Sequence, residues 1–247
     1  EFYQLDLEMA FAGQEDVFAV LEQVLPPIFA QYGTYSIASD APFTRIPYLE
    51  AMEKYGSDKP DLRIDLTVAD ATALLADCGF GPFAGHTVKA VVVSDFSGTR
   101  KQIDQLCADV EVQAGEKAYW FRLDEQGELV GGISKFVQEK KDAVIRALGL
   151  QPNCFVGLTA GTRLTAQKTA GVLRNKLGNF CPGHMDRERY EFCWIVDFPM
   201  YEIGEESGAL EFCHNPFSMP NGGLEILKKA AAGEIDPLTI TAYQYDL

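Results

Sequence analysis

The sequence predicts an α+β protein in which a two-layer α/β unit, residues 66–189, is inserted between two strand-rich segments, residues 1–65 and 190–247. Apolar periodicity in the middle unit follows the order β-α-β-β-α-β-α, which is typical of helices packed on one face of a sheet. The predicted strands of the two outer segments resemble each other in sequence pattern and differ from those of the middle unit. We therefore interpret the middle unit as an insertion.

The first segment opens on an alternating stretch, residues 1–12, that predicts a strand. Its apolar face carries Tyr3, Leu5, Leu7 and Met9, and its polar face carries Gln4, Asp6 and Glu8. Residues 13–33 have the apolar spacing of a helix, in which the pair Pro26–Pro27 predicts a kink or an early end. A second, short helix ends at Gly56.

The middle unit and the last segment are predicted from the same periodicities. In the middle unit we predict helices at 66–80, 97–115, 138–150 and 162–180, and strands at 88–96, 117–124, 129–137 and 153–161. Thr99 and Gln102 fit a capping box at the start of the second of these helices. In the last segment we predict strands at 190–202 and 239–247, a strand that runs into a loop at 211–220, and a helix at 222–236.

Charge and composition exclude several classes of protein. The net charge is −15, from 21 Lys and Arg against 36 Asp and Glu, and such a surface as a whole repels nucleic acid. The six cysteines have irregular spacing and the three histidines are scattered, which argues against a disulfide framework or an intrinsic metal site.

No apolar run approaches the ~18–20 residues that cross a bilayer, and no export signal is visible. We therefore expect a cytoplasmic protein, and because the chain begins at Glu1 and ends within a pattern, we expect a piece of a longer one.

Two glycine motifs are weak candidates for phosphate sites. The residue pattern of "GFGPFA", residues 79–84, matches a dinucleotide fingerprint, which needs a strand before it and a helix after it. Here a predicted helix precedes it and a strand follows, so we interpret it as a helix stop and a turn. "GGIS", residues 131–134, could form an anion-binding nest, although a bulge or tight bend suits it better.

Three other stretches carry side chains that could bind a ligand. Gln4, Asp6 and Glu8 would form a row on one strand face, which suits an ammonium group, a metal ion or an arginine, and the alternative is a solvated outer face. In "CHNPFSMP", His214 stands in a rigid loop and could meet a carboxylate, or simply lie in a turn. "YGSDKPDLR", residues 55–63, is either an active-site loop or a joint whose charges pair with one another.

In order and spacing, five stretches closely resemble bacterial-type aspartyl-tRNA synthetase, a class II enzyme: "EFYQLDLEM", "YGSDKPDLR", "TRKQID", "WIVDFPMYE" and "HNPFSMP". The resemblance spans the whole chain. It implies that residues 66–189 are the inserted GAD-type domain, and that the flanks are parts of the antiparallel catalytic sheet. A piece of the related amidotransferase subunit is excluded by the flanks.

The resemblance also implies an activity and site residues. The parent enzyme would activate aspartate with ATP and Mg²⁺ and transfer it to tRNA. Gln4, Asp6 and His214 would line the aspartate pocket, and Glu8 would either support the row of Gln4 and Asp6 or face ATP and Mg²⁺. The arginines of motifs 2 and 3 would lie outside residues 1–247, so the piece alone is expected to lack catalytic residues and activity. Asn215 stands where the family commonly has a second histidine.

A rival interpretation is a docking module for tRNA or a protein, with Arg100 and Lys101 as the tRNA contacts. The sequence leaves open whether the parent charges one tRNA or both tRNA-Asp and tRNA-Asn. It also leaves open the effect of Asn215, the role of Lys59 and Arg63, and the role of the inserted domain. The parent is expected to be a homodimer; whether the piece is a monomer stays open.

Overall fold

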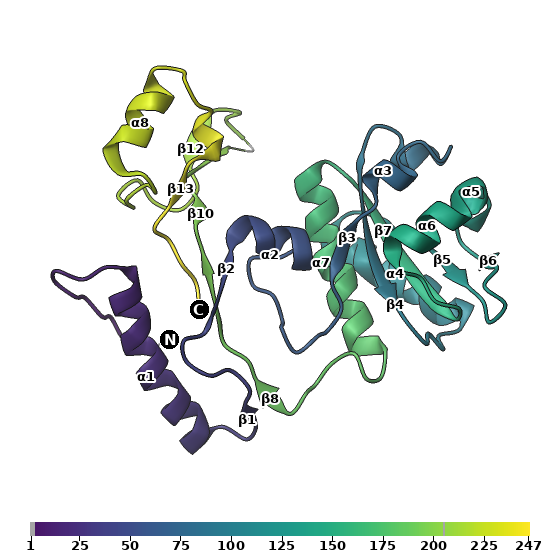
Figure 1. Cartoon of the computed structure of the whole chain (residues 1–247), viewed down its shortest axis with the longest axis horizontal. Coiled ribbons are helices and arrows are strands. Elements are labelled where there is room, and N and C mark those ends of the chain that lie inside the picture. The colour runs from purple at the N-terminus through teal and green to yellow at the C-terminus, as the bar shows by residue number, and fades with distance from the viewer. Residues whose placement is uncertain (1–2, 205) are drawn as a thin grey trace. The chain divides into compact units, whose positions relative to one another are not determined.

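The computed structural model of the chain describes residues 3–204 and 206–247 (Figure 1). It divides into two compact units: unit 1 comprises Glu1–Tyr48 and Glu188–Leu247, and unit 2 comprises Leu49–Arg187. Residues 49–65, which the sequence analysis placed in the first segment, therefore belong to the unit that contains the middle sheet. Glu1 and Phe2 of the predicted first strand lie outside the described residues.

Unit 2 is built on a five-stranded sheet with the order β3-β4-β7-β5-β6, in which every neighbouring pair is antiparallel. Its strands are β3 (Val68–Asp70), β4 (Thr87–Val93), β5 (Ala118–Leu123), β6 (Leu129–Val130) and β7 (Cys154–Gly161). Its helices are α2 (Tyr48–Tyr55), which starts at the last residue of the first part of unit 1, α3 (Thr72–Leu75), η1 (Gly81–Phe83), α4 (Arg100–Ala114), α5 (Ser134–Val137), η2 (Gln138–Lys140), α6 (Lys141–Leu148) and α7 (Arg163–Phe180).

Helices cover both faces of this sheet, which corrects the two-layer prediction. On one face α4 and α7 bury a core that includes Ile103, Leu173 and Phe155. On the other face the short elements α3, η1, α5 and α6 cover a second core around Phe83, Val144 and Val156, among others. Strand residues alternate between the two cores, because successive side chains of a strand point to opposite faces. The short helices of the second face were missed as a layer because they carry too few turns for a clear period.

Two predicted elements of unit 2 are wrong. Residues 66–80 do not form one helix: Val68–Asp70 pairs with β4, and only Thr72–Leu75 is helical. Residues 129–137 are not one strand, because Gly131 and Gly132 have φ of 73° and 46° and turn the chain into α5. A Cβ on Gly132 would lie 1.8 Å from the Trp120 carbonyl oxygen, so the tight bend expected for "GGIS" requires glycine here.

Other predictions for unit 2 are confirmed. Helix α4 starts with the expected capping box, in which the Thr99 amide donates to the Gln102 Oε1 atom at 2.9 Å. Strands β5 and β7 and helices α6 and α7 lie within the predicted ranges, and β4 begins one residue before its predicted range. "GFGPFA" forms a turn with the 3₁₀ helix η1 between α3 and β4, as the rejection of the dinucleotide fingerprint required.

Unit 1 combines helices with several two-stranded sheets. Its elements are α1 (Gln14–Tyr32), β1 (Ser36–Ile37), β2 (Thr44–Pro47), β8 (Arg189–Tyr190), β9 (Cys193–Val196), β10 (Phe198–Pro199), β11 (Tyr201–Ile203), β12 (Leu210–Phe212), α8 (Gly223–Ala231), η3 (Pro237–Thr239) and β13 (Thr241–Ala242). The pairs β1–β8 and β2–β9 are parallel, and β10–β13 and β11–β12 are antiparallel. Parallel pairing of β2 with β9 joins the two separate parts of unit 1.

A buried carboxylate organises the core of unit 1. Phe18 stacks on Trp194 with ring centroids 3.9 Å apart. The Glu22 Oε1 atom accepts hydrogen bonds from the Phe43 amide (3.0 Å), the Trp194 Nε1 atom (2.9 Å) and the Arg45 guanidinium (2.8 Å). A carboxylate this buried is tolerated because each donor replaces water. The helix that carries Glu22 runs through Pro26–Pro27 to Tyr32, so the predicted early end is wrong.

The first predicted strand is absent as well. Residues 3–9 have no regular secondary structure, and Tyr3 and Leu5 are more than 90% exposed. A strand is stabilised by hydrogen bonds to a neighbouring strand, and the described residues offer this segment none. The alternating sequence is present, but alternation alone does not pair the backbone.

Candidate functional site

His214 lies in the loop that follows β12, in unit 1. The amide of Cys213 donates to the Met200 carbonyl oxygen at 3.0 Å, which fixes the chain just before the imidazole. The His214 ring packs edge-on against Phe198, with ring centroids 5.2 Å apart. Neither ring nitrogen is hydrogen-bonded within the described residues. The imidazole is therefore held by packing and keeps both nitrogens for a ligand.

A hollow of about 300 Å³ lies beside this ring. Its lining residues are Phe198, His214, Asn215, Ser218, Tyr243, Gln244, Tyr245 and Asp246. The lining combines aromatic walls with an imidazole, two amides, a hydroxyl and a carboxylate. A small polar molecule that carries charges of both signs suits such a lining.

The polar groups of the hollow are connected to one another. The Asn215 Oδ1 atom accepts from the Ser218 amide (2.9 Å) and from the Ser218 hydroxyl (2.7 Å), which closes the turn after His214. The Ser218 hydroxyl in turn accepts from the Gln244 Nε2 atom at 2.8 Å. The Gln244 Oε1 atom is buried and has no partner among the described residues. Sequence reasoning missed Ser218 and Gln244, because neither stands at a spacing that marks a site.

The polar row of the first segment does not reach this hollow. Gln4, Asp6 and Glu8 are exposed and absent from its lining. The Gln4 amide donates to the Asp6 carboxylate at 2.5 Å, so these two side chains point the same way, as a shared strand face requires. The side chains of Gln4 and Asp6 are thus arranged as on one strand face, but the segment pairs with no strand among the described residues.

Arg100 and Lys101 stand at the start of α4 in unit 2. Arg100 pairs with Asp104 one turn later at 3.1 Å and lies over the Trp120 ring, 5.2 Å from its centroid. Lys101 is exposed. An arginine that is paired with an acid and stacked on an indole contributes little positive potential to a docking surface.

The loop "YGSDKPDLR" pairs most of its own charges, and it is tied to α7. Lys59 bonds to Asp58 at 2.8 Å, and Arg63 makes a two-pronged contact with Asp61 at 2.8 and 2.9 Å. The Arg63 hydrogen bond lowers the pKa of the Asp61 carboxyl below its usual value. This pairing agrees with the interpretation of the loop as a joint.

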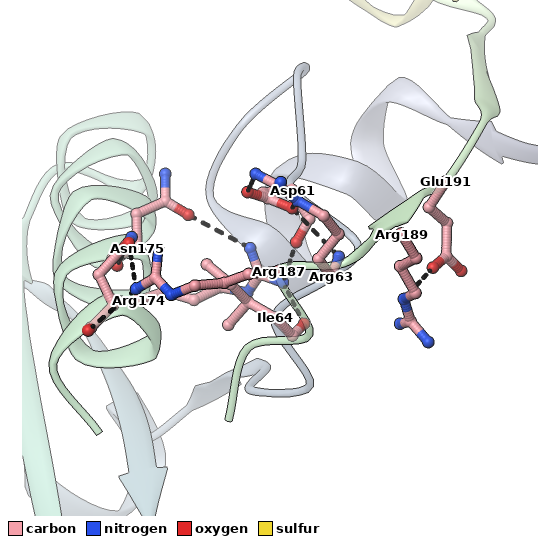
Figure 2. Close-up of polar contacts among 9 residues, drawn as sticks. Asp61, Arg63, Ile64, Arg174, Asn175, Arg187, Arg189 and Glu191 are labelled. Atoms are coloured by element: carbon pink, nitrogen blue, oxygen red, sulfur yellow. Dashed lines mark hydrogen bonds and ion pairs between the residues drawn. The ribbon is translucent and has the colours of Figure 1, made fainter. Parts of the chain in front are cut away.

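Arg174 holds the loop from the other side. Its guanidinium, buried on α7, donates to the carbonyl oxygens of Leu66 (2.6 Å), Ile64 (2.7 Å) and Asp61 (2.9 Å), and Figure 2 shows it reaching toward Asp61 and Ile64. Burial lowers the pKa of the Arg174 guanidinium below its ordinary value. An arginine next to core-facing Leu173 and four residues after Ala170 was the available signal in the sequence.

Glycines bring the loop and the helix together. Gly56 has a φ of 67°, and a Cβ on it would lie 2.4 Å from the Gly171 amide nitrogen. A Cβ on Gly171 would lie 2.4 Å from the Gly56 carbonyl oxygen. Both positions exclude larger residues, so the backbone after α2 contacts the backbone of α7 directly.

A second buried cation links α2 to the sheet. Lys89 of β4 is fully buried and pairs with Glu53 of α2 and with Asp70 at 2.9 Å. Glu53 also accepts from Gln167 at 2.6 Å and Arg163 at 3.2 Å. Partial burial by itself raises the pKa of Glu53 and of Asp70, but the hydrogen bonds and charge of Lys89 outweigh it and the net pKa of each is lowered.

Comparison with known proteins decides the family. The family model of tRNA synthetases class II (D, K and N) matches residues 1–247. This chain belongs to that family.

Curated relatives of this class II synthetase chain are aspartate–tRNA ligases. It is 45% identical over 250 residues to the aspartate–tRNA ligase of Streptomyces coelicolor, covering 100% of the chain and 41% of the relative. It is 44% identical over 253 residues to the aspartate–tRNA(Asp/Asn) ligase of Acidiphilium cryptum, covering 100% of the chain and 42% of the relative. The aspartate–tRNA(Asp/Asn) ligase of Rickettsia prowazekii is 38% identical over 254 residues, with the same coverage. The chain thus spans about two fifths of the length of these relatives.

The resemblance to aspartyl-tRNA synthetase is therefore confirmed, whereas the roles of single residues stay predictions. Within the described parts of this synthetase chain, no three His, Cys, Asp or Glu side chains gather as a metal site. Magnesium in a nucleotide site is usually held by one or two carboxylates together with phosphate oxygens, and Asp246 supplies one carboxylate in the hollow. No helix in residues 3–204 and 206–247 is long and apolar enough to cross a membrane.

Proposed function

We propose that the enzyme to which this chain contributes is an aspartate–tRNA ligase. The observation that carries the proposal is that the whole chain aligns with curated aspartate–tRNA ligases at 38–45% identity. The hollow beside His214 supports it, because its imidazole and amide groups suit a small zwitterion such as an amino acid. The expectation of a cytoplasmic enzyme and a homodimer comes with this proposal.

The reaction has two steps. The aspartate α-carboxylate attacks the α-phosphorus of ATP, and a P–O bond breaks to release pyrophosphate and leave aspartyl-adenylate. A ribose hydroxyl at the 3′ end of tRNA then attacks the acyl carbon, and AMP leaves. Both steps depend on positioning and on stabilising charge, so binding side chains contribute much of the rate.

We assign roles to five residues in this reaction. His214 would contact aspartate from the loop after β12, with Gln4 and Asp6 on the opposite wall once the first segment pairs in the complete catalytic sheet. Asp6 would hold the substrate α-ammonium. Glu8, with Asp246 of the hollow, would supply carboxylates on the side of ATP and Mg²⁺; Mg²⁺ neutralises phosphate charge when it is bound.

The test is aspartate-dependent ATP–pyrophosphate exchange by the full-length enzyme. We expect exchange with aspartate and none with glutamate. The 247-residue chain alone is expected to be inactive, because the resemblance would place the phosphate-binding arginines outside residues 1–247. Exchange by the isolated chain would contradict that expectation, and absence of exchange by the full-length enzyme would contradict the proposed function.

The choice of tRNA is part of the same test. The relatives include ligases named for tRNA-Asp and ligases named for both tRNA-Asp and tRNA-Asn, at nearly equal identity. Aminoacylation of both purified tRNAs by the full-length enzyme separates the two cases.

We further propose that residues 66–189, most of which lie in unit 2, are the inserted GAD-type domain, and that the loop at residues 55–63 leads into it. The rival function, a tRNA-docking module, predicts salt-sensitive tRNA binding by the 247-residue chain that Arg100→Ala and Lys101→Ala weaken. We expect no such binding, since the net charge is −15 and Arg100 is paired with Asp104.

A further inference from the structure

The turn that carries His214 is closed by side chains rather than by backbone alone. Asn215 follows the histidine directly, and its Oδ1 atom accepts from both the amide and the hydroxyl of Ser218. Upstream, the Cys213 amide is held by the Met200 carbonyl oxygen. The chain is thus fixed by hydrogen bonds on both sides of His214. Those on the C-terminal side are accepted by the side-chain amide of Asn215.

The hydrogen bonds of Ser218 have a defined direction. A hydroxyl has one proton to donate, and here the proton goes to Asn215 Oδ1 at 2.7 Å. A lone pair of the same oxygen then accepts from Gln244 Nε2 at 2.8 Å. The chain Gln244 to Ser218 to Asn215 therefore links the segment after β13 to the residue next to His214.

Burial of the Gln244 side chain has a cost in folding free energy. The side chain is 9% exposed and its Oε1 atom is buried without a partner among the described residues. An unpaired buried acceptor destabilises the fold, and an apolar side chain of similar size would avoid the loss. The gain that offsets it is the donated bond to Ser218.

We propose that Gln244 and Ser218 are positioning residues that act through Asn215 to hold the His214 imidazole in the orientation that meets aspartate. This rests on the proposed function for the identity of the ligand, but not for the geometry. It gives Asn215 a structural role in the turn. The histidine at 214 then depends on a glutamine thirty residues further along the chain.

The kinetic test uses the full-length enzyme and steady-state ATP–pyrophosphate exchange. We expect Ser218→Ala to raise KM for aspartate about tenfold and to change KM for ATP by less than about twofold. Ser218→Thr keeps the hydroxyl and should restore a KM near that of the wild type. A merely structural role would lower the folded fraction, and hence the apparent kcat, without changing KM.

A double-mutant cycle tests the linkage. Gln244→Leu should raise KM for aspartate in the same way, and the double variant Ser218→Ala/Gln244→Leu should be no worse than Ser218→Ala alone. The matched control is Ser207→Ala, which removes a hydroxyl that likewise donates to an acceptor side chain, Glu211, outside the hollow. Additive effects, or an unchanged KM in Ser218→Ala, would overturn the proposal.

A second measurement needs no activity. In the 247-residue chain, the ring signals of His214 report its packing on Phe198, and only three histidines need to be told apart by NMR. We expect Ser218→Ala and Gln244→Leu to shift the His214 ring signals, and Ser207→Ala to leave them in place. Unmoved signals would overturn the positioning role, even if the full-length enzyme had a different substrate; loss of all exchange in the wild type would count only against the proposed function.

Discussion

Unit 2 and unit 1 differ in how completely they bury their apolar side chains. Of the large apolar residues that are exposed in the described parts of the chain, eighteen belong to unit 1 and four to unit 2, although unit 2 is the longer. Unit 2 has a five-stranded sheet with a core on each face, whereas the sheets in the described part of unit 1 have two strands each. In a sheet covered on both faces, the strands hydrogen-bond to one another and the apolar side chains are buried. An isolated pair of strands leaves backbone groups and apolar side chains exposed.

The two units also differ in where the candidate site and the buried charged groups lie. The candidate site lies in unit 1, beside exposed residues such as Phe217 and Met219, and the buried ionic networks lie mainly in unit 2. Unit 2 thus has the properties of an independently stable domain, and unit 1 those of a site-bearing part.

The largest expected effect is separate unfolding of the two units. Each contains one tryptophan, Trp194 in unit 1 and Trp120 in unit 2, and both are buried. In Trp194→Phe, fluorescence should report unit 2 with a urea midpoint about 1 M or more above that of unit 1, reported in Trp120→Phe. Circular dichroism of the wild type should show both transitions. Coincident midpoints would mean that the two units are equally stable.

A large effect confined to unit 2 is expected for Arg174→Met. This substitution leaves the carbonyl oxygens of Leu66, Ile64 and Asp61 without their buried donor, and should lower the free energy of unfolding by about 3 kcal/mol. The Trp120 midpoint should fall and the Trp194 midpoint should stay. Arg146→Met, at an exposed position of α6, is the matched control and should change neither. A fall in the Trp194 midpoint would show that the loop supports unit 1.

A smaller effect confined to unit 1 is expected for Glu22→Gln. The carboxylate takes three donors, and a neutral amide would weaken these bonds by about 1–2 kcal/mol in total. Only the Trp194 midpoint should fall. Glu15→Gln removes the exposed partner of Arg45 and should cost less than about 0.5 kcal/mol. Equal effects of the two substitutions would show that Glu22 is not the central acceptor of this core.

The smallest effect is the response of unit 2 to acid. The pKa values of Glu53 and Asp70 are lowered from their ordinary values of 4.5 and 3.8, so their contribution to stability is complete above about pH 4.5 and is lost as pH falls through the lowered values. Lys89→Met should reduce stability at neutral pH and make the decline below pH 4.5 shallower. The measurement is the Trp120 urea midpoint between pH 7 and pH 3. Lys54→Met, which breaks an exposed pair on the same helix, should leave the slope unchanged.

Local patterns predicted much of unit 2 correctly. The capping box of Thr99 and Gln102 and the apolar run of β4 depend on residues close in sequence, so both were predictable. The two buried cations, Lys89 in an apolar strand and Arg174 on an apolar helix face, were not singled out from the sequence, because their partners are far away in sequence. Glu53 and Lys89 are brought together only when α2 packs on the sheet.

The sequence by itself determined the family and the helix and strand types of the longer elements, because each depends on local motifs or on spacing along the chain. Only the tertiary structure decided which segments pair, that helices cover both faces of the middle sheet, and that Gln244 reaches the His214 turn through Ser218. The first segment shows the physical reason. Its alternation is local, but a strand forms only where another backbone accepts its hydrogen bonds, and that partner is a property of the fold.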